Sequence, residues 1–244
     1  MAFGMDPRTL AQTQSRAGAR GAEIDAGLRE YMLGVYNYMT GGLALTGLVA
    51  FGLGQMAPET LIAIYSVPVL PYLIMFAPLG FILALSFGIH KMSVGTVQVL
   101  FWSFAAVMGL SLASIFMVYT GASIARVFFI TAATFAGMSL YGYTTKKDLS
   151  GWGSFLIMGL IGLIIASIVN IFLASSALHF VISAAGVLIF TGLTAYDTQK
   201  IKAWYVAGEV GEAVAKKTIY GATMLYLDFV NLFMMLLSLF GNRE

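Results

Sequence analysis

Long apolar stretches separated by short polar turns dominate this sequence. About 20 mostly apolar residues are needed for a helix to cross roughly 30 Å of hydrocarbon. Seven stretches satisfy this requirement, with approximate bounds Tyr31–Gly54, Leu61–Gly88, Val94–Tyr119, Ile124–Tyr143, Trp152–Leu173, Leu178–Tyr196 and Thr218–Phe240. The pattern predicts an all-α integral membrane protein with seven transmembrane helices. Three prolines in the second stretch predict a kinked or tilted helix there.

Composition agrees with a membrane protein and excludes several other classes. Apolar residues make up 59% of the 244 residues and charged residues only 10%, whereas a soluble domain has about 25% charged residues. The net charge of +2 and the lack of a basic stretch with interleaved aromatics argue against nucleic-acid binding. The chain has no cysteine, so disulfides and thiolate chemistry are excluded.

The chain divides into a polar tail and one membrane domain. Residues 1–28 have mixed charge and no apolar core, so they do not resemble a cleaved signal peptide. We expect a cytoplasmic tail over 1–28, ending in a short helix, and a transmembrane domain over 29–244. With seven spans, eleven of the 13 Lys and Arg residues fall on one side, and Arg126 and Arg243 fall on the other. This asymmetry predicts a cytoplasmic N-terminus and an external C-terminus.

Two aspartates are the strongest candidates for a functional site. Asp228 lies inside the last apolar stretch, roughly 15 Å from its start at 1.5 Å per residue. A charge at that depth costs at least ~2.5–3.5 kcal/mol on insertion scales, so Asp228 should face the protein interior or water. Asn231 lies on the same helical face and is a candidate hydrogen-bond partner. Asp197 ends the sixth stretch, where the alternative is an interfacial residue paired with Lys200.

The two carboxyls would form a pH-sensitive cation site if they meet in the bundle. Adjacent carboxylates cannot both ionise cheaply, so such a pair shares a proton. Oxygen ligands suit a hard cation such as Ca²⁺ rather than zinc. We therefore expect Ca²⁺ at Asp197 and Asp228 as a bound or permeant ion, and no tightly bound cofactor. The alternative for Asp228 is a buried structural carboxyl held by tyrosine or asparagine.

Three other charged residues are possible supporting groups. Arg126 is expected to mark the outer membrane interface by extending its side chain toward water, and a role in an ion pathway is the alternative. His90 and Lys91 end the second stretch and are expected in a cytoplasmic turn, where His90 could also sense pH.

The sequence contains no complete enzyme motif, so we predict that the protein is not an enzyme. HExxH, Walker and GxSxG patterns are absent. An intramembrane aspartyl protease is a minor alternative because it needs two aspartates. However, only the Tyr196-Asp197 half of its usual motif pair is present.

Two motifs resemble a known family. The run Phe190-Thr-Gly-Leu-Thr-Ala-Tyr-Asp-Thr-Gln-Lys-Ile201 and the run Ala222-Thr-Met-Leu-Tyr-Leu-Asp-Phe-Val-Asn-Leu-Phe233 are similar to those of the Bax inhibitor-1 family, also called transmembrane Bax inhibitor motif proteins. The segment from Phe128 to Ser150 looks like the bacterial branch. The resemblance covers about residues 28–241. It implies a bacterial inner-membrane protein with a central last helix and a di-aspartyl pair, Asp197 and Asp228, that gates a slow pH-sensitive Ca²⁺ leak.

One departure and one rival function accompany this resemblance. Relatives with a characterised leak carry an arginine near the cytoplasmic end of the second helix that contacts the aspartate pair. Here that region reads Phe87-Gly-Ile-His-Lys-Met92, so only His90 or Lys91 could substitute, and neither has the bidentate geometry of arginine. Some bacterial members resemble modulators that bind a membrane-anchored ATP-dependent protease. In that alternative the N-terminal tail makes the contact and the aspartates are structural.

Overall fold

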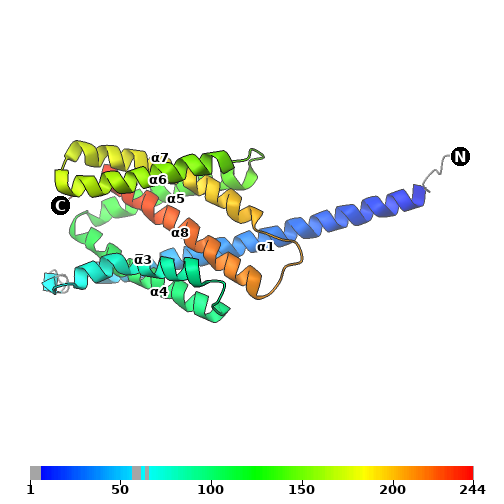
Figure 1. Cartoon of the computed structure of the whole chain (residues 1–244), viewed down its shortest axis with the longest axis horizontal. Helices are drawn as coiled ribbons and strands as arrows, with labels where there is room; N and C mark the ends of the chain where they lie inside the picture. The colour runs from blue at the N-terminus through cyan, green and yellow to red at the C-terminus, as the bar shows by residue number, and fades with distance from the viewer. Residues whose placement is uncertain (1–6, 57–61, 64–65, 244) are drawn as a thin grey trace.

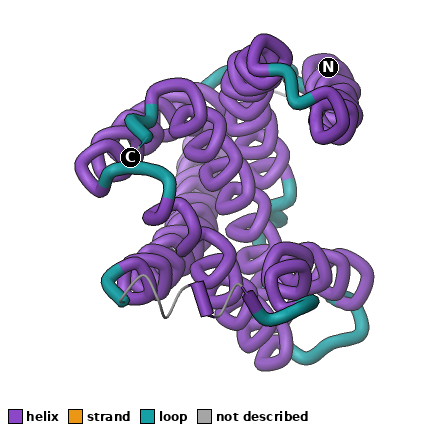
Figure 2. The backbone as a smooth tube through the Cα atoms, turned by 90° about the vertical axis from the view of Figure 1, so that its left-hand side faces the viewer, coloured by secondary structure: helices purple, strands orange, loops and turns teal. Residues whose placement is uncertain are grey.

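The computed structural model describes residues 7–56, 62–63 and 66–243, and this part of the chain is helical apart from short connections. Figure 2 views it from the end at which the last helix finishes. The elements are α1 (Pro7–Gly54), α3 (Leu70–Gly88), α4 (Val94–Leu112), the 3-10 helix η1 (Ala113–Met117), α5 (Gly121–Thr144), α6 (Ser150–Leu173), α7 (Ser176–Ala203) and α8 (Glu212–Phe240). The all-α prediction is confirmed for the described residues.

Six of the described helical segments are long and apolar enough to cross a membrane: α3, α4 with η1, α5, α6, α7 and α8. The first predicted span, Tyr31–Gly54, forms the second half of α1 but is not among the six. Tyr36, Asn37, Tyr38 and Thr40 interrupt its apolar character. It nevertheless ends at Gly54, as predicted.

The second predicted span, Leu61–Gly88, is wrong at its N-terminal end. Of this stretch, 61 and 64–65 lie outside the described residues, and α3 begins only at Leu70. Val69 has a positive φ of 75°, which breaks helical geometry just before α3. Pro71 occupies the first turn, where proline is tolerated, and Pro78 lies inside the helix.

The connection between the last two helices is shorter than the polar segment Asp197–Lys217 predicted from the sequence. Helix α7 continues to Ala203 and α8 begins at Glu212, so only 204–211 form the loop. Thr198 and Ile201 are buried, which favours helix in the last turns of α7 despite their polar neighbours. Lysines in the last turn of α7 and Glu212 in the first turn of α8 also suit the helix dipoles.

Side-chain caps define several helix starts. Ser93, Thr120 and Ser175 each precede a helix, and their hydroxyls accept hydrogen bonds from backbone N–H groups three residues later. Such caps satisfy backbone donors that have no partner within the helix. The turns between successive spans can therefore be very short, which keeps neighbouring helices antiparallel.

Helix α8 has the most extensive packing of the described spans. In its most apolar window 56% of the residues are buried, against 11–33% for the other five. It contacts α1, α4, α5 and α7. Figure 1 shows it running diagonally between the α6–α7 pair and the α3–α4 pair.

The two ends of the bundle differ in charge. The turns that carry Lys91, Lys146 and Lys147 and the α7–α8 loop lie at the end from which α1 projects (Figure 1). The opposite end holds the turn between η1 and α5, the α6–α7 turn and the C-terminus. Basic residues of the short connections are thus collected at one end.

The C-terminal residues are fixed to the start of α5. The backbone N–H of Thr120 donates to the carbonyl of Asn242 at 3.1 Å, and the N–H of Asn242 donates to the hydroxyl of Ser123 at 2.9 Å. Arg126 donates to the carbonyl of Phe240 at 3.3 Å. These contacts, with the bridge between Tyr119 and Arg243, hold the C-terminal end of α8.

Candidate functional site: a buried aspartate pair

Asp197 and Asp228 come together between the two C-terminal helices. Asp197 lies two turns before the end of α7, and Asp228 lies near the middle of α8. Both are buried, with exposed fractions of 9% and 5%. Their helices make the most extensive helix–helix contact in the described structure.

The two carboxyls lie close enough to form a hydrogen bond with each other. A carboxyl–carboxyl hydrogen bond requires a proton on one partner, because two carboxylates have no donor between them. Oδ2 of Asp228 is buried and has no assigned hydrogen-bond partner among the described residues. An acceptor of this kind is costly unless a proton, a water molecule or a cation satisfies it.

Lys200 is the cation that acts on the pair. It attracts Asp197 electrostatically, and its Nζ lies 5.7 Å from the ring centre of Tyr196 and 5.8 Å from that of Trp204. The aromatic contacts hold the ammonium at the end of α7. Asp197 is thus buried next to Asp228 and is also influenced by the charge of Lys200, without a direct ion pair to it among the described residues.

A chain of hydroxyls begins at Thr198, the residue that follows Asp197 in the sequence. Thr198 donates to the carbonyl of Thr194 at 2.7 Å. Its hydroxyl lies 3.0 Å from that of Ser139 on α5, and the Ser139 hydroxyl lies 2.5 Å from that of Tyr36 on α1. These polar contacts link three helices at the level of the site. Sequence reasoning missed Tyr36 and Ser139 because neither carries a charge or belongs to a known motif.

The site has few fixed ligands for a cation. In the described part of the chain, no group of three or more His, Cys, Asp or Glu residues is placed to hold a metal ion. Ca²⁺ takes six to eight oxygen ligands, so two carboxylates would need water or hydroxyl oxygens to complete the shell.

The other sequence candidates lie away from the pair. Asn231 donates to the carbonyl of Leu227 at 2.8 Å on its own helix, rather than to Asp228. Arg126 is exposed and donates a hydrogen bond to the Phe240 carbonyl at the C-terminal end of α8. His90 and Lys91 are exposed in the α3–α4 turn.

These features define an integral membrane protein, a helical bundle with a buried acidic pair. Comparison with known proteins identifies its family. The family model described as inhibitor of apoptosis-promoting Bax1 matches residues 28–244, and the chain belongs to this Bax inhibitor-1 family.

Individual relatives agree over nearly the full chain. The sequence is 47% identical to the inner membrane protein YbhL of Escherichia coli K12 over 227 residues, which is 90% of this chain and 94% of YbhL. It is 50% identical to RP147 of Rickettsia prowazekii over 224 residues, 91% and 93% of the two chains. Membrane protein SpyM3_0260 of Streptococcus pyogenes is 34% identical over 225 residues, 91% and 96% of the two chains.

Proposed function

We propose that the protein is a pH-sensitive calcium-leak channel or transporter in which the Asp197–Asp228 pair is both pH sensor and ion gate. The observation that carries the proposal is the buried carboxyl pair with an unpartnered oxygen on Asp228. A shared proton holds α7 and α8 together. Its loss leaves two adjacent negative charges that repel each other and attract a cation.

The proposal includes a topology. The second half of α1 is added to the six apolar spans as a seventh, with α8 enclosed by the others. Two observations support it: α8 is the most buried span, and the basic turns lie at one end (Figure 1). We place that end in the bacterial cytoplasm, in line with the positive-inside rule and the inner-membrane location in the name of YbhL.

Calcium flux into liposomes tests the site. Purified protein is reconstituted, and uptake is followed from pH 6 to 8 for wild type and for the double variant Asp197→Asn/Asp228→Asn. We expect wild-type flux to change severalfold across this range. The double variant should lose that pH dependence, because amides keep hydrogen bonding but cannot exchange a proton.

Asp148→Asn is the matched control, because Asp148 is an exposed carboxyl in the α5–α6 turn. A hydrogen bond with Ser150 lowers the pKa of Asp148 below its usual value, so this group stays ionised from pH 6 to 8. The control should behave as wild type. Wild-type flux equal to that of empty liposomes at every pH would contradict the channel proposal.

A second candidate function is binding and restraint of a membrane-anchored ATP-dependent protease. It is favoured by the first part of α1, which projects well beyond the bundle (Figure 1). Deletion of residues 1–28 separates the two functions. It should spare ion flux and abolish protease regulation, whereas Asp228→Asn should do the reverse.

A further inference from the structure

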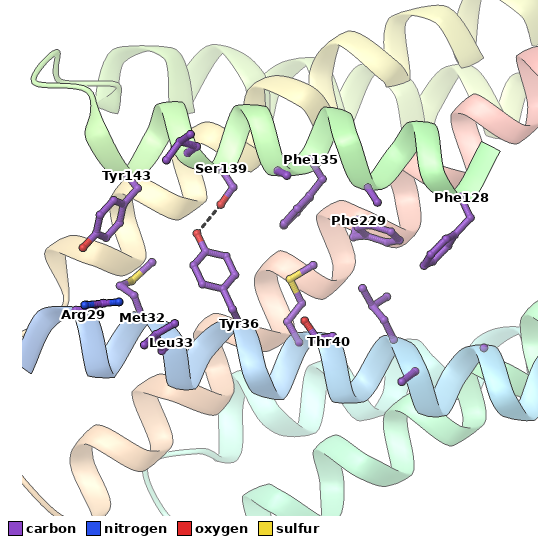
Figure 3. A pocket seen from close by; sticks show the side chains of 17 residues that line it. Arg29, Met32, Leu33, Tyr36, Thr40, Phe128, Phe135, Ser139, Tyr143 and Phe229 are labelled. Atoms are coloured by element: carbon purple, nitrogen blue, oxygen red, sulfur yellow. Dashed lines mark hydrogen bonds between the residues drawn. The ribbon is translucent and has the colours of Figure 1, made fainter. Parts of the chain in front are cut away.

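A long groove separates α1 from α5 on the side of the bundle. Its volume is about 850 Å³, and Phe229 of α8 contributes to its lining between the two helices. Figure 3 shows the groove with side chains from α1 on one side and from α5 on the other. It is distinct from the aspartate pair, since neither Asp197 nor Asp228 lines it.

Most of the groove is apolar and open to the membrane. Met32 and Phe135 are buried in it, whereas Leu33 and Leu140 keep exposed fractions of 51% and 63%. A groove of this kind in hydrocarbon has few polar groups to bind water. It therefore needs an apolar occupant.

One end of the groove is cationic. Arg29 is exposed there and lies opposite Tyr143 (Figure 3). It makes no ion pair with any described residue. Tyr143 is itself contacted by Lys202 of α7, which donates to the Tyr143 carbonyl at 2.7 Å and has its Nζ 4.8 Å from the tyrosine ring centre. Among the described residues, Arg29 is thus the one charged residue in the lining of the groove.

A hydrogen bond across the groove prevents a helix from lying along its whole length. The hydroxyls of Tyr36 and Ser139 meet across it at 2.5 Å (Figure 3), which ties α1 to α5 at that level. A helix with its side chains is about 10–12 Å wide, whereas an extended acyl chain is far thinner. The shape therefore favours a lipid chain over a helix from a second copy.

We propose that the α1–α5 groove binds one anionic phospholipid from the leaflet at the Arg29 end. The acyl chain lies along the apolar lining, and the phosphate and its anionic headgroup lie at Arg29. A basic side chain near the membrane surface attracts anionic lipid. This site is independent of the proposed ion leak and does not require it.

Native mass spectrometry tests the proposal. Purified full-length protein is titrated with phosphatidylglycerol or phosphatidylcholine of identical acyl chains, and bound lipids are counted. Wild type should bind one phosphatidylglycerol more tightly than phosphatidylcholine. Arg29→Gln should reduce that preference about fivefold, the size expected for one basic side chain. Ala136→Trp, which fills the groove, should weaken binding of both lipids.

Two matched variants separate the site from general effects. Lys146→Gln removes an exposed cation at the same end but outside the groove, and Ala133→Trp adds the same bulk on an exposed face of α5 outside the lining. Both should bind lipid as wild type. Equal binding of the two lipids by wild type, or equal behaviour of Ala136→Trp and Ala133→Trp, would overturn the proposal. The proposal would also be overturned if wild type formed a lipid-free dimer and the Ala136→Trp variant were monomeric, because a second copy would then occupy the groove.

Discussion

At the scale of residues, Thr46 joins three helices through a single hydroxyl. It donates to the carbonyl of Ala105 on α4 at 2.7 Å. The Thr46 proton is used in that bond, so the Tyr226 hydroxyl on α8, also 2.7 Å away, must donate to the Thr46 oxygen. Tyr226 is fully buried and its ring packs edge-on against Phe104. The Thr46 hydroxyl therefore accepts a hydrogen bond from the Tyr226 hydroxyl, which is buried away from water.

Tyr226→Phe removes this bond without changing the ring. We expect the free energy of unfolding to fall by about 0.6–1.7 kcal/mol, the range found for hydrogen bonds between membrane helices. The measurement is denaturation in detergent micelles. Tyr141→Phe is the control, because Tyr141 is 45% exposed on α5, and it should leave stability unchanged. Equal stability of both variants would contradict the role given to the Tyr226 hydroxyl.

At the scale of elements, α5 and α7 approach so closely that one contact position admits only glycine. A Cβ at Gly142 would collide with the backbone carbonyl of Ala195. Backbone cannot move aside as a flexible side chain can, so a larger residue would push the helices apart. Small residues serve the same purpose in many membrane helix pairs. The contact also fixes the position of Asp197, two residues after Ala195, along the axis of α5.

Gly142→Ala should therefore destabilise the fold by about 1–3 kcal/mol, the usual cost of overpacking. Gly137→Ala on the same helix is the control, since its added Cβ would meet nothing within 4 Å. Thermal unfolding of both variants in detergent checks the difference. A Gly142→Ala variant as stable as Gly137→Ala would show that α5 and α7 can separate at no cost.

At the scale of the whole molecule, the separation of charge between the two ends predicts a single orientation. The chain has no cysteine, so introduced cysteines report accessibility without background. Lys146→Cys and Asn242→Cys lie at opposite ends, and both positions are exposed. A membrane-impermeant maleimide should label Lys146→Cys only in inside-out vesicles and Asn242→Cys only in right-side-out vesicles. Labelling of both positions from the same side would rule out an odd number of membrane crossings between residues 146 and 242.

Much of the fold was predictable because polar turns interrupt apolar stretches sharply. The ends at Gly54, Gly88 and Leu173 match the helices found. The end of α7 was not predictable, because Thr198 and the lysines around it look solvent-exposed in sequence, although Thr198 is buried. Proline and polar residues obscured the start of α3.

The candidate site was predictable in its residues but not in its contacts. A carboxyl deep in an apolar stretch identifies Asp228 from sequence alone, because its insertion is costly. That it meets Asp197 depends on the rotation of α7 against α8, which periodicity does not encode. The groove was not foreseen at all, since it depends on which neighbouring helix faces fail to pack.

The contacts of the C-terminus fix one end of α8, so a tilt of this helix would move the residues that lie away from that end. The C-terminal end is held by Ser123 and Arg126, so a tilt of α8 about these contacts would displace residues more the farther they lie from that end. Asp228 lies twelve residues before Phe240, roughly 18 Å from the pivot. A swing of about 5° would displace its carboxyl by roughly 1.5 Å, enough to break a hydrogen bond.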